Sequence, residues 1–234
     1  MINALGPADA RWAEGSTARI AHAVLLALAD QAARVIPLVA IAPMLLGDVS
    51  PFEATPPAFL LLGIIVVLQA GVVIGLGLLR WGRVSLRDLG WRIDALGADV
   101  GRGVAGFAIV AALTLGLHCA QRGGVGVSDV WNAVSGYSLA QRALFFLIGV
   151  IAAFGEESIF RGYLQPTLMK RCGEPGGVLL TAAFFSVYHL QFAPWRLLGL
   201  FAIGLVYGIL RSRDRSLIAP AIAHWLCWAV LGGI

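Results

Sequence analysis

Long apolar runs separated by short polar connections make up most of this sequence. A bilayer core of about 30 Å needs about 20 apolar residues in a helix to cross it, and most of the runs approach that length. The pattern therefore predicts an all-α, polytopic membrane helix bundle of about seven transmembrane helices, within a range of six to eight. The runs cover about residues 20–46, 58–79, 103–120, 143–168, 178–192, 195–210 and 217–234.

The connections between these runs are marked by proline and glycine, which interrupt regular helices. Residues 47–57 contain three prolines and are predicted to form a loop. Residues 121–141 are predicted to form a glycine-rich loop. Residues 170–177 are predicted to form a basic turn that separates the fourth run from the fifth.

The connection over residues 80–102 has a helix signal of its own. Ser85 is followed three residues later by Asp88, which is the spacing of a capping box. We expect either a short amphipathic helix there that lies on the membrane surface or an ordinary solvated linker. With the amphipathic helix, Trp81 and Trp91 would lie at the level of the lipid headgroups.

The composition excludes a soluble domain, because 59% of the residues are hydrophobic and only 13% are charged. A multi-pass protein of the cell (inner) membrane is expected, with the lipid bilayer as its surroundings. The length suits one transmembrane domain over residues 1–234, with residues 1–18 as a cytoplasmic lead-in. No basic run with interleaved aromatic residues occurs, so no nucleic acid is expected as a partner.

The charges in the connections indicate an orientation. If the N-terminus is cytoplasmic, most Arg and Lys residues fall in inside segments. The outside segments then hold only Arg122, Arg142 and Arg196. Cytoplasmic loops of membrane proteins carry an excess of Lys and Arg. We therefore predict a cytoplasmic N-terminus.

Charged side chains at bilayer depth are costly, so they are rare and mostly functional. The fourth run contains Glu156, Glu157 and Arg161. Glu157 and Arg161 are four residues apart, so they share a helix face and are expected to pair. Glu156 is rotated from Glu157 by about 100°, and we expect it to remain unpaired with Arg161 and to face another neighbour. The simpler interpretation is a buried salt bridge that only locks two helices together.

Four further polar side chains lie in apolar runs and are expected to serve as packing or interface residues. They are His22, Asp30, Arg34 and His118. Asp30 and Arg34 have the same four-residue spacing as the pair above, so we expect them to pair with each other.

Two histidines in later runs, His189 and His224, could join Glu156 at one point. A single His in an apolar helix is more often a packed core residue. One carboxylate and two imidazoles together could bind a divalent metal such as zinc, with an open fourth position. Alternatively, Glu156 could act as a general base toward water while the histidines orient the water or stabilise the oxyanion. The residues alone leave both alternatives open.

The order of these motifs resembles a known family, the CAAX protease and bacteriocin-processing (CPBP, also called Abi) intramembrane proteases. The eukaryotic type II CAAX prenyl endopeptidase belongs to this family. The resemblance covers about residues 147–228, which would be the catalytic core. The motifs are Glu156-Glu157-x-x-x-Arg161, then Phe185-x-x-x-His189, then His224 preceded by residues 216–220.

The resemblance implies a role for each residue of these motifs. Glu156 would activate the hydrolytic water. Glu157 and Arg161 would support it by pairing. His189 and His224 would hold the water, the oxyanion or a metal, and Phe185 would pack beside the site.

One position departs from the family pattern. Family members commonly have Asn or Asp four residues after the last His, whereas this chain has Trp228 there. A polar group that would help to orient water or stabilise the oxyanion is therefore missing, and the loss of one oxyanion donor costs about a hundred- to a thousandfold in rate. Taken by itself, Trp228 is expected to face lipid or the membrane interface.

The leading hypothesis is an intramembrane endopeptidase that hydrolyses a peptide bond of a membrane-associated protein or peptide with water activated by Glu156. The alternative is a non-catalytic membrane scaffold or bacteriocin-immunity-type protein of the same fold, which Trp228 favours. A third hypothesis is a proton-coupled carrier that uses Glu156 and the histidines as a relay.

Overall fold

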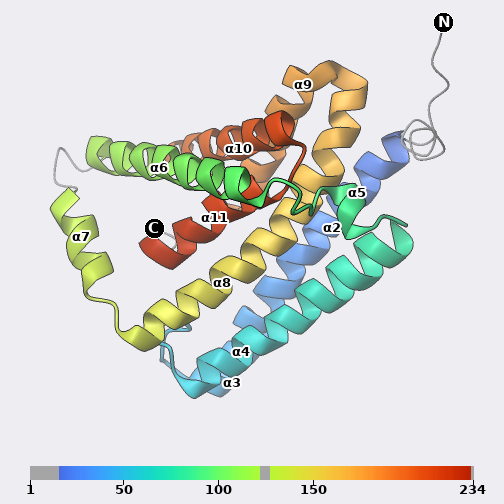
Figure 1. The fold of residues 1–234 in the computed structure, drawn as a ribbon. Coiled ribbons are helices and arrows are strands. Elements are labelled where there is room, and N and C mark those ends of the chain that lie inside the picture. Colours follow the sequence, from blue (N-terminus) through green and yellow to red (C-terminus); the bar gives the residue numbers. More distant parts are fainter. Residues whose placement is uncertain (1–15, 122–126, 233–234) are drawn as a thin grey trace, which may run out of the picture.

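The computed structural model describes residues 16–121 and 127–232, and all regular structure in these ranges is helical (Figure 1). Three of the helical segments, labelled η, have π-helical geometry. The helices are α2 (Ser16–Ile36), η1 (Pro37–Ile41), α3 (Ala42–Leu46), α4 (Pro56–Val66), η2 (Val67–Trp81), α5 (Leu86–Leu89), α6 (Leu96–Gln121), α7 (Val127–Ser135), α8 (Leu139–Glu157), η3 (Ser158–Leu164), α9 (Gln165–Tyr188), α10 (Pro194–Asp214) and α11 (Ile218–Leu231).

Five continuous helical stretches in the described residues are long and apolar enough to cross a membrane, and α11 is a shorter apolar helix. The predicted all-helical, multi-pass membrane architecture is therefore confirmed. The count of about seven spans stays a prediction: it would need α11 to cross the membrane and the longest stretch to cross it twice. The five stretches are Thr17–Leu46, Pro56–Trp81, Leu96–Gln121, Leu139–Tyr188 and Pro194–Asp214.

The longest stretch, Leu139–Tyr188, is divided by a sharp bend at Gly173. Gly173 has φ 75° and ψ 169°, a conformation that side chains with a Cβ rarely adopt. The chain turns back there (Figure 1), and a Cβ at Gly177 would lie 2.4 Å from Met169 Cγ. The turn predicted at residues 170–177 is therefore a bend inside α9. That each arm crosses the bilayer separately stays a prediction.

One prediction about the connections needs correction. Residues 121–141, predicted to be a glycine-rich loop, contain helix α7 and the beginning of α8. The predicted lead-in over residues 1–18 lies mostly outside the described residues, and α2 begins at Ser16.

The predicted capping box is present, and it begins the short helix α5. Ser85 accepts a hydrogen bond from the Asp88 backbone N–H, and Asp88 accepts one from the Ser85 backbone N–H. The indole N–H of Trp91 donates to Ser158 Oγ at 2.9 Å, and its predicted place at headgroup level stays a prediction. Trp81 is 75% exposed, so its position at the headgroups stays a prediction.

The helices pack closely around η3, which is wholly buried. Helix α11 packs against α6 and α8, and α10 packs against α9. A Cβ at Gly204 would lie 3.0 Å from Ala182 Cα, and one at Gly208 would lie 3.0 Å from Val178 Cγ1. Small residues of this kind allow helix backbones to approach closely in a membrane. This tight packing brings α8, α9 and α11 together around one point.

The connections predicted to be cytoplasmic lie at one end of the bundle. Arg171, beside the bend in α9, donates a hydrogen bond to Thr17 Oγ1 at 2.7 Å. Arg211, near the end of α10, donates to the Leu89 carbonyl at 3.2 Å. The Leu217 N–H donates to the Gly90 carbonyl at 2.8 Å. This grouping agrees with the charge pattern, while the orientation in a membrane stays a prediction.

Candidate functional site

The two adjacent glutamates lie at the end of α8, where the chain passes into the π-helix η3. Glu156 is 1% exposed, and Glu157 and Arg161 are 0% exposed. Arg161 Nη1 donates to Glu157 Oε1 at 3.1 Å, so the pair expected from their spacing is formed. Short π-helical segments occur often at functional sites.

Arg161 is fixed on several sides although it has no contact with solvent. Its Nη2 donates to the Gly204 carbonyl at 3.2 Å. Its guanidinium carbon lies 4.1 Å from the centre of the Phe185 ring and 5.2 Å from that of Tyr207. Aromatic faces attract a cation, and they help to compensate its burial. Phe185 therefore packs beside the site, as expected, and it does so by covering Arg161.

His224 on α11 reaches the same carboxylate from the other side. Its Nδ1 lies 2.9 Å from Glu157 Oε1, and its ring stacks on Tyr207 with centroids 5.3 Å apart and an interplanar angle of 20°. Because a carboxylate accepts hydrogen bonds, Nδ1 carries the proton. The opposite nitrogen, Nε2, lies 3.9 Å from Glu156 Oε2.

His189 ends helix α9 and approaches Glu156 in a similar way. Its Nδ1 donates to the Phe185 carbonyl at 2.7 Å, and its Nε2 lies 3.8 Å from Glu156 Oε2. Glu156 Oε2 is buried and has no hydrogen-bond partner. The structure thus brings together Glu156 at the end of α8, His189 at the end of α9 and His224 on α11.

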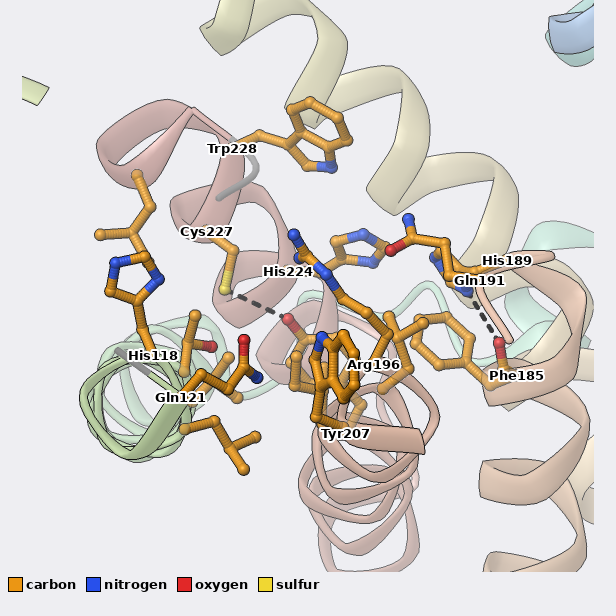
Figure 2. Close-up of a pocket in the computed structure, with 18 residues that line it drawn as sticks. His118, Gln121, Phe185, His189, Gln191, Arg196, Tyr207, His224, Cys227 and Trp228 are labelled. Atoms are coloured by element: carbon orange, nitrogen blue, oxygen red, sulfur yellow. Dashed lines mark hydrogen bonds between the residues drawn. The ribbon is translucent and has the colours of Figure 1, made fainter. Parts of the chain in front are cut away.

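A cavity of about 460 Å³ opens beside the two histidines (Figure 2). Its walls come from α6, α9, α10 and α11 and from the connection that precedes α10. Phe185 and Tyr207 form an apolar part of the wall beside the histidines. Gln191 and Arg196 contribute polar groups to the wall. The cavity reaches both imidazoles.

Residues 138–230 match the family model of Rce1-like type II CAAX prenyl endopeptidases. This segment is an Rce1-like domain. It begins at Ser138, the N-cap of α8, and ends within α11, so it includes all three converging side chains. The resemblance found in the sequence over about residues 147–228 is thereby confirmed. No curated protein and no solved structure matches the chain.

Trp228 lines the cavity of the Rce1-like domain, together with His224 and Cys227. It is partly buried, and its Cβ lies 2.8 Å from the place that a Cβ on Gly149 would take. Trp228 thus contacts α8 and lines the cavity, and its predicted contact with lipid or the interface stays a prediction.

Arg34 reaches the Rce1-like domain from α2, and sequence reasoning missed this contact. Its Nη1 donates to Glu156 Oε1 at 2.7 Å, and its Nη2 donates to Asp30 Oδ2 at 3.0 Å. The predicted pair of Asp30 and Arg34 is present, but Glu156 is not the unpaired acid that was expected. His118, also expected to be a packing residue, lines the cavity. One signal in the sequence could have found the contact of Arg34 with Glu156. Asp30 and Arg34 are charged residues in an apolar run, as Glu156, Glu157 and Arg161 are, and charge at bilayer depth is equally costly for both sets.

The geometry does not favour the metal alternative. No group of three or more His, Cys, Asp or Glu side chains in the described ranges is placed to hold a metal ion. One oxygen of Glu156 is already bound to the Arg34 guanidinium. A divalent cation at Glu156, His189 and His224 would lie next to that positive charge.

Proposed function

We propose that this protein is an intramembrane endopeptidase in which Glu156 acts as the general base. One observation carries the proposal: the free oxygen of Glu156, Oε2, faces Nε2 of His189 at 3.8 Å and Nε2 of His224 at 3.9 Å. These separations are too long for direct hydrogen bonds, and polar groups so spaced are commonly bridged by a water molecule. A water bound there would contact the base and both imidazoles.

The reaction divides into two proton transfers. Glu156 takes a proton from the water as its oxygen attacks the scissile carbonyl carbon, which gives a tetrahedral intermediate with a negatively charged oxygen. The carbon–nitrogen bond then breaks, and the protonated Glu156 gives its proton to the leaving amine. The carboxylate is restored, and the products are a new carboxyl group and a new amine.

The hydrogen bonds of the histidines support different roles for the two rings. His189 donates from Nδ1 to a backbone carbonyl, so in its neutral form Nε2 is an acceptor that can orient the water. His224 donates from Nδ1 to Glu157, whose negative charge would compensate an imidazolium. In that form Nε2–H of His224 would donate to the oxyanion.

The same cavity supports a membrane-associated peptide or protein as the substrate. The cavity lies within a bundle of membrane-type helices and combines apolar walls with polar groups near the histidines. An extended peptide backbone needs hydrogen-bond partners wherever it leaves water. Gln191 and Arg196 are side chains on the cavity wall that could provide them.

The test uses the full-length protein in liposomes with two kinds of internally quenched peptide. One probe is a farnesylated peptide ending in a CAAX sequence, and the other is a set of lipid-anchored peptides without a prenyl group. Glu156→Gln should abolish cleavage, while Glu174→Gln, at an exposed position of α9, should cleave like the wild type. Equal cleavage by Glu156→Gln and the wild type would remove the assigned role of Glu156.

Trp228 supports one second candidate, a non-catalytic scaffold of the same fold, because it occupies the wall of the cavity in place of a polar residue. This candidate predicts that cells expressing Glu156→Gln keep the function of the protein while deletion of α11 destroys it. It also predicts no cleavage of either probe by the wild type. Cleavage that depends on Glu156 would exclude it.

A further inference from the structure

We propose that helix α2, which lies outside the Rce1-like domain, completes the site, and that Arg34 is the positioning residue that orients Glu156. The inference rests on the proposed function, because it explains how the general base is held. It concerns a part of the chain that the family match over residues 138–230 does not include.

Arg34 joins two buried carboxylates with the two ends of one guanidinium group. Nη1 donates to Glu156 Oε1 at 2.7 Å, and Nη2 donates to Asp30 Oδ2 at 3.0 Å. Asp30 is 0% exposed and Glu156 is 1% exposed, so both carboxylates depend on the protein for compensation of their charge. The planar fork of an Arg fixes direction as well as charge. Because Arg34 holds Oε1 of Glu156, the other oxygen, Oε2, is left to face the two histidines.

The same turn of α2 also holds the end of α9. The Tyr188 hydroxyl donates to Asp30 Oδ2, and Gln31 Nε2 donates to the Tyr188 carbonyl. The guanidinium carbon of Arg34 lies 5.0 Å from the centre of the Tyr188 ring. Tyr188 directly precedes His189 in the chain. One helix turn therefore sets both the direction of the carboxylate and the backbone that presents His189.

A purely structural ion pair would stabilise the fold without affecting the chemical step, so the test must separate the two. The matched control is Arg102→Gln. Arg102 also joins two helices through an ion pair, with its Nη1 2.8 Å from Asp214 Oδ1, but it is not among the residues around Glu156. We call the two hydrogen bonds from Arg34 to Glu156 and Asp30 the clamp. Arg34→Gln removes the clamp. Arg34→Lys keeps the charge but lacks the fork that can bind two carboxylates at once.

The kinetic readout is the cleavage of the quenched peptides by full-length protein in liposomes. A small misplacement of a catalytic group costs about a hundredfold in rate, so Arg34→Gln should lower kcat by about that factor. KM should stay within about threefold, because the clamp does not contact the substrate. Arg34→Lys should recover part of the loss, and Arg102→Gln should keep the wild-type kcat. Wild-type kcat in Arg34→Gln would overturn the proposal.

An infrared measurement tests the clamp without any cleavage. The difference between the spectra of the wild type and Glu156→Gln isolates the carboxylate band of Glu156. In the Arg34→Gln background this band should shift, whereas in the Arg102→Gln background it should not. If the band did not shift in the Arg34→Gln background, the proposed role of Arg34 would be overturned, even if the protein cleaved the peptides. A shifted band in a protein that cleaves neither probe would support the clamp and contradict only the proposed function.

Discussion

His224 donates a hydrogen bond to Glu157 Oε1 at 2.9 Å, and this is the same oxygen that accepts from Arg161 at 3.1 Å. Glu157 thus joins a buried cation on η3, the segment that continues its own helix, to an imidazole on α11. The spacing in the sequence indicates only the first of these contacts. Glu157 therefore both neutralises Arg161 and sets which nitrogen of His224 faces Glu156.

Replacing Glu157 should destabilise the fold strongly. In Glu157→Gln the guanidinium of Arg161, which is 0% exposed, would lose its counter-charge. Breaking a buried pair in this way costs about 3–5 kcal/mol. Chemical denaturation of the purified protein in mixed micelles would measure the loss. Glu174→Gln, at an exposed position, is the control and should leave the free energy of unfolding unchanged; an equal effect of the two substitutions would contradict the paired role.

The contact between α8 and α11 should be sensitive to a single added methyl group. A Cβ at Gly149 would lie 2.8 Å from Trp228 Cβ and 2.9 Å from the Trp225 carbonyl oxygen, so α11 must move away. Gly149→Ala should cost about 1–3 kcal/mol of stability and should also lower kcat, because His224 lies on α11.

The control for this substitution is Gly116→Ala in α6, where an added Cβ meets nothing within 4 Å. A Gly to Ala change inside a helix is otherwise favourable by about 1 kcal/mol. Gly116→Ala should therefore be neutral or stabilising in thermal unfolding. If Gly149→Ala behaved in the same way, the close packing of α8 on α11 would be disproved.

Trp228→Asn should increase the proposed endopeptidase activity. It places an amide donor where the family commonly has one, on the wall of the cavity that contains the histidines. One such donor is worth about a hundred- to a thousandfold in rate, so a rise in kcat of at least about tenfold is expected in the peptide assay. Trp81→Asn, at a tryptophan that is 75% exposed, is the control and should not change kcat.

Gln191 and Arg196 provide a second test of the missing donor, since both line the cavity. If one of them already serves the oxyanion, its replacement by Ala should lower kcat by about a hundredfold, and Trp228→Asn should restore part of that loss. An unchanged kcat in both single variants would show that neither side chain supplies the donor.

The predicted orientation can be tested with the native thiol of Cys172, which is free and exposed beside the bend in α9. In a variant that keeps only this cysteine, with Cys119→Ser and Cys227→Ser, a membrane-impermeant maleimide should label intact cells poorly and opened cells well. A second variant for comparison carries the further substitutions Cys172→Ser and Ser135→Cys. They move the thiol to α7, on the side predicted to be outside. Strong labelling of Cys172 in intact cells would show that the orientation is opposite to the predicted one.

Much of the fold could be predicted because apolar runs and charge patterns are local properties of the chain. The runs located every long helix of the described residues, and Ser85 with Asp88 correctly predicted a capping box. Helix α7 was missed because its segment is short and lies next to a glycine-rich stretch, without a long apolar run. The bend at Gly173 joins two predicted helices into one stretch, since a single residue with positive φ reverses the chain without a loop.

The sequence by itself determined that this is a helical, multi-pass membrane protein with an Rce1-like segment, and that Glu157 pairs with Arg161, because helix periodicity sets which neighbours share a face. Only the tertiary structure decided which partner Glu156 takes. Arg34 is 122 residues away, and contacts between helices depend on how they pack rather than on spacing along either one. The same packing placed Trp228 on the cavity wall and aligned both imidazoles with one oxygen of Glu156.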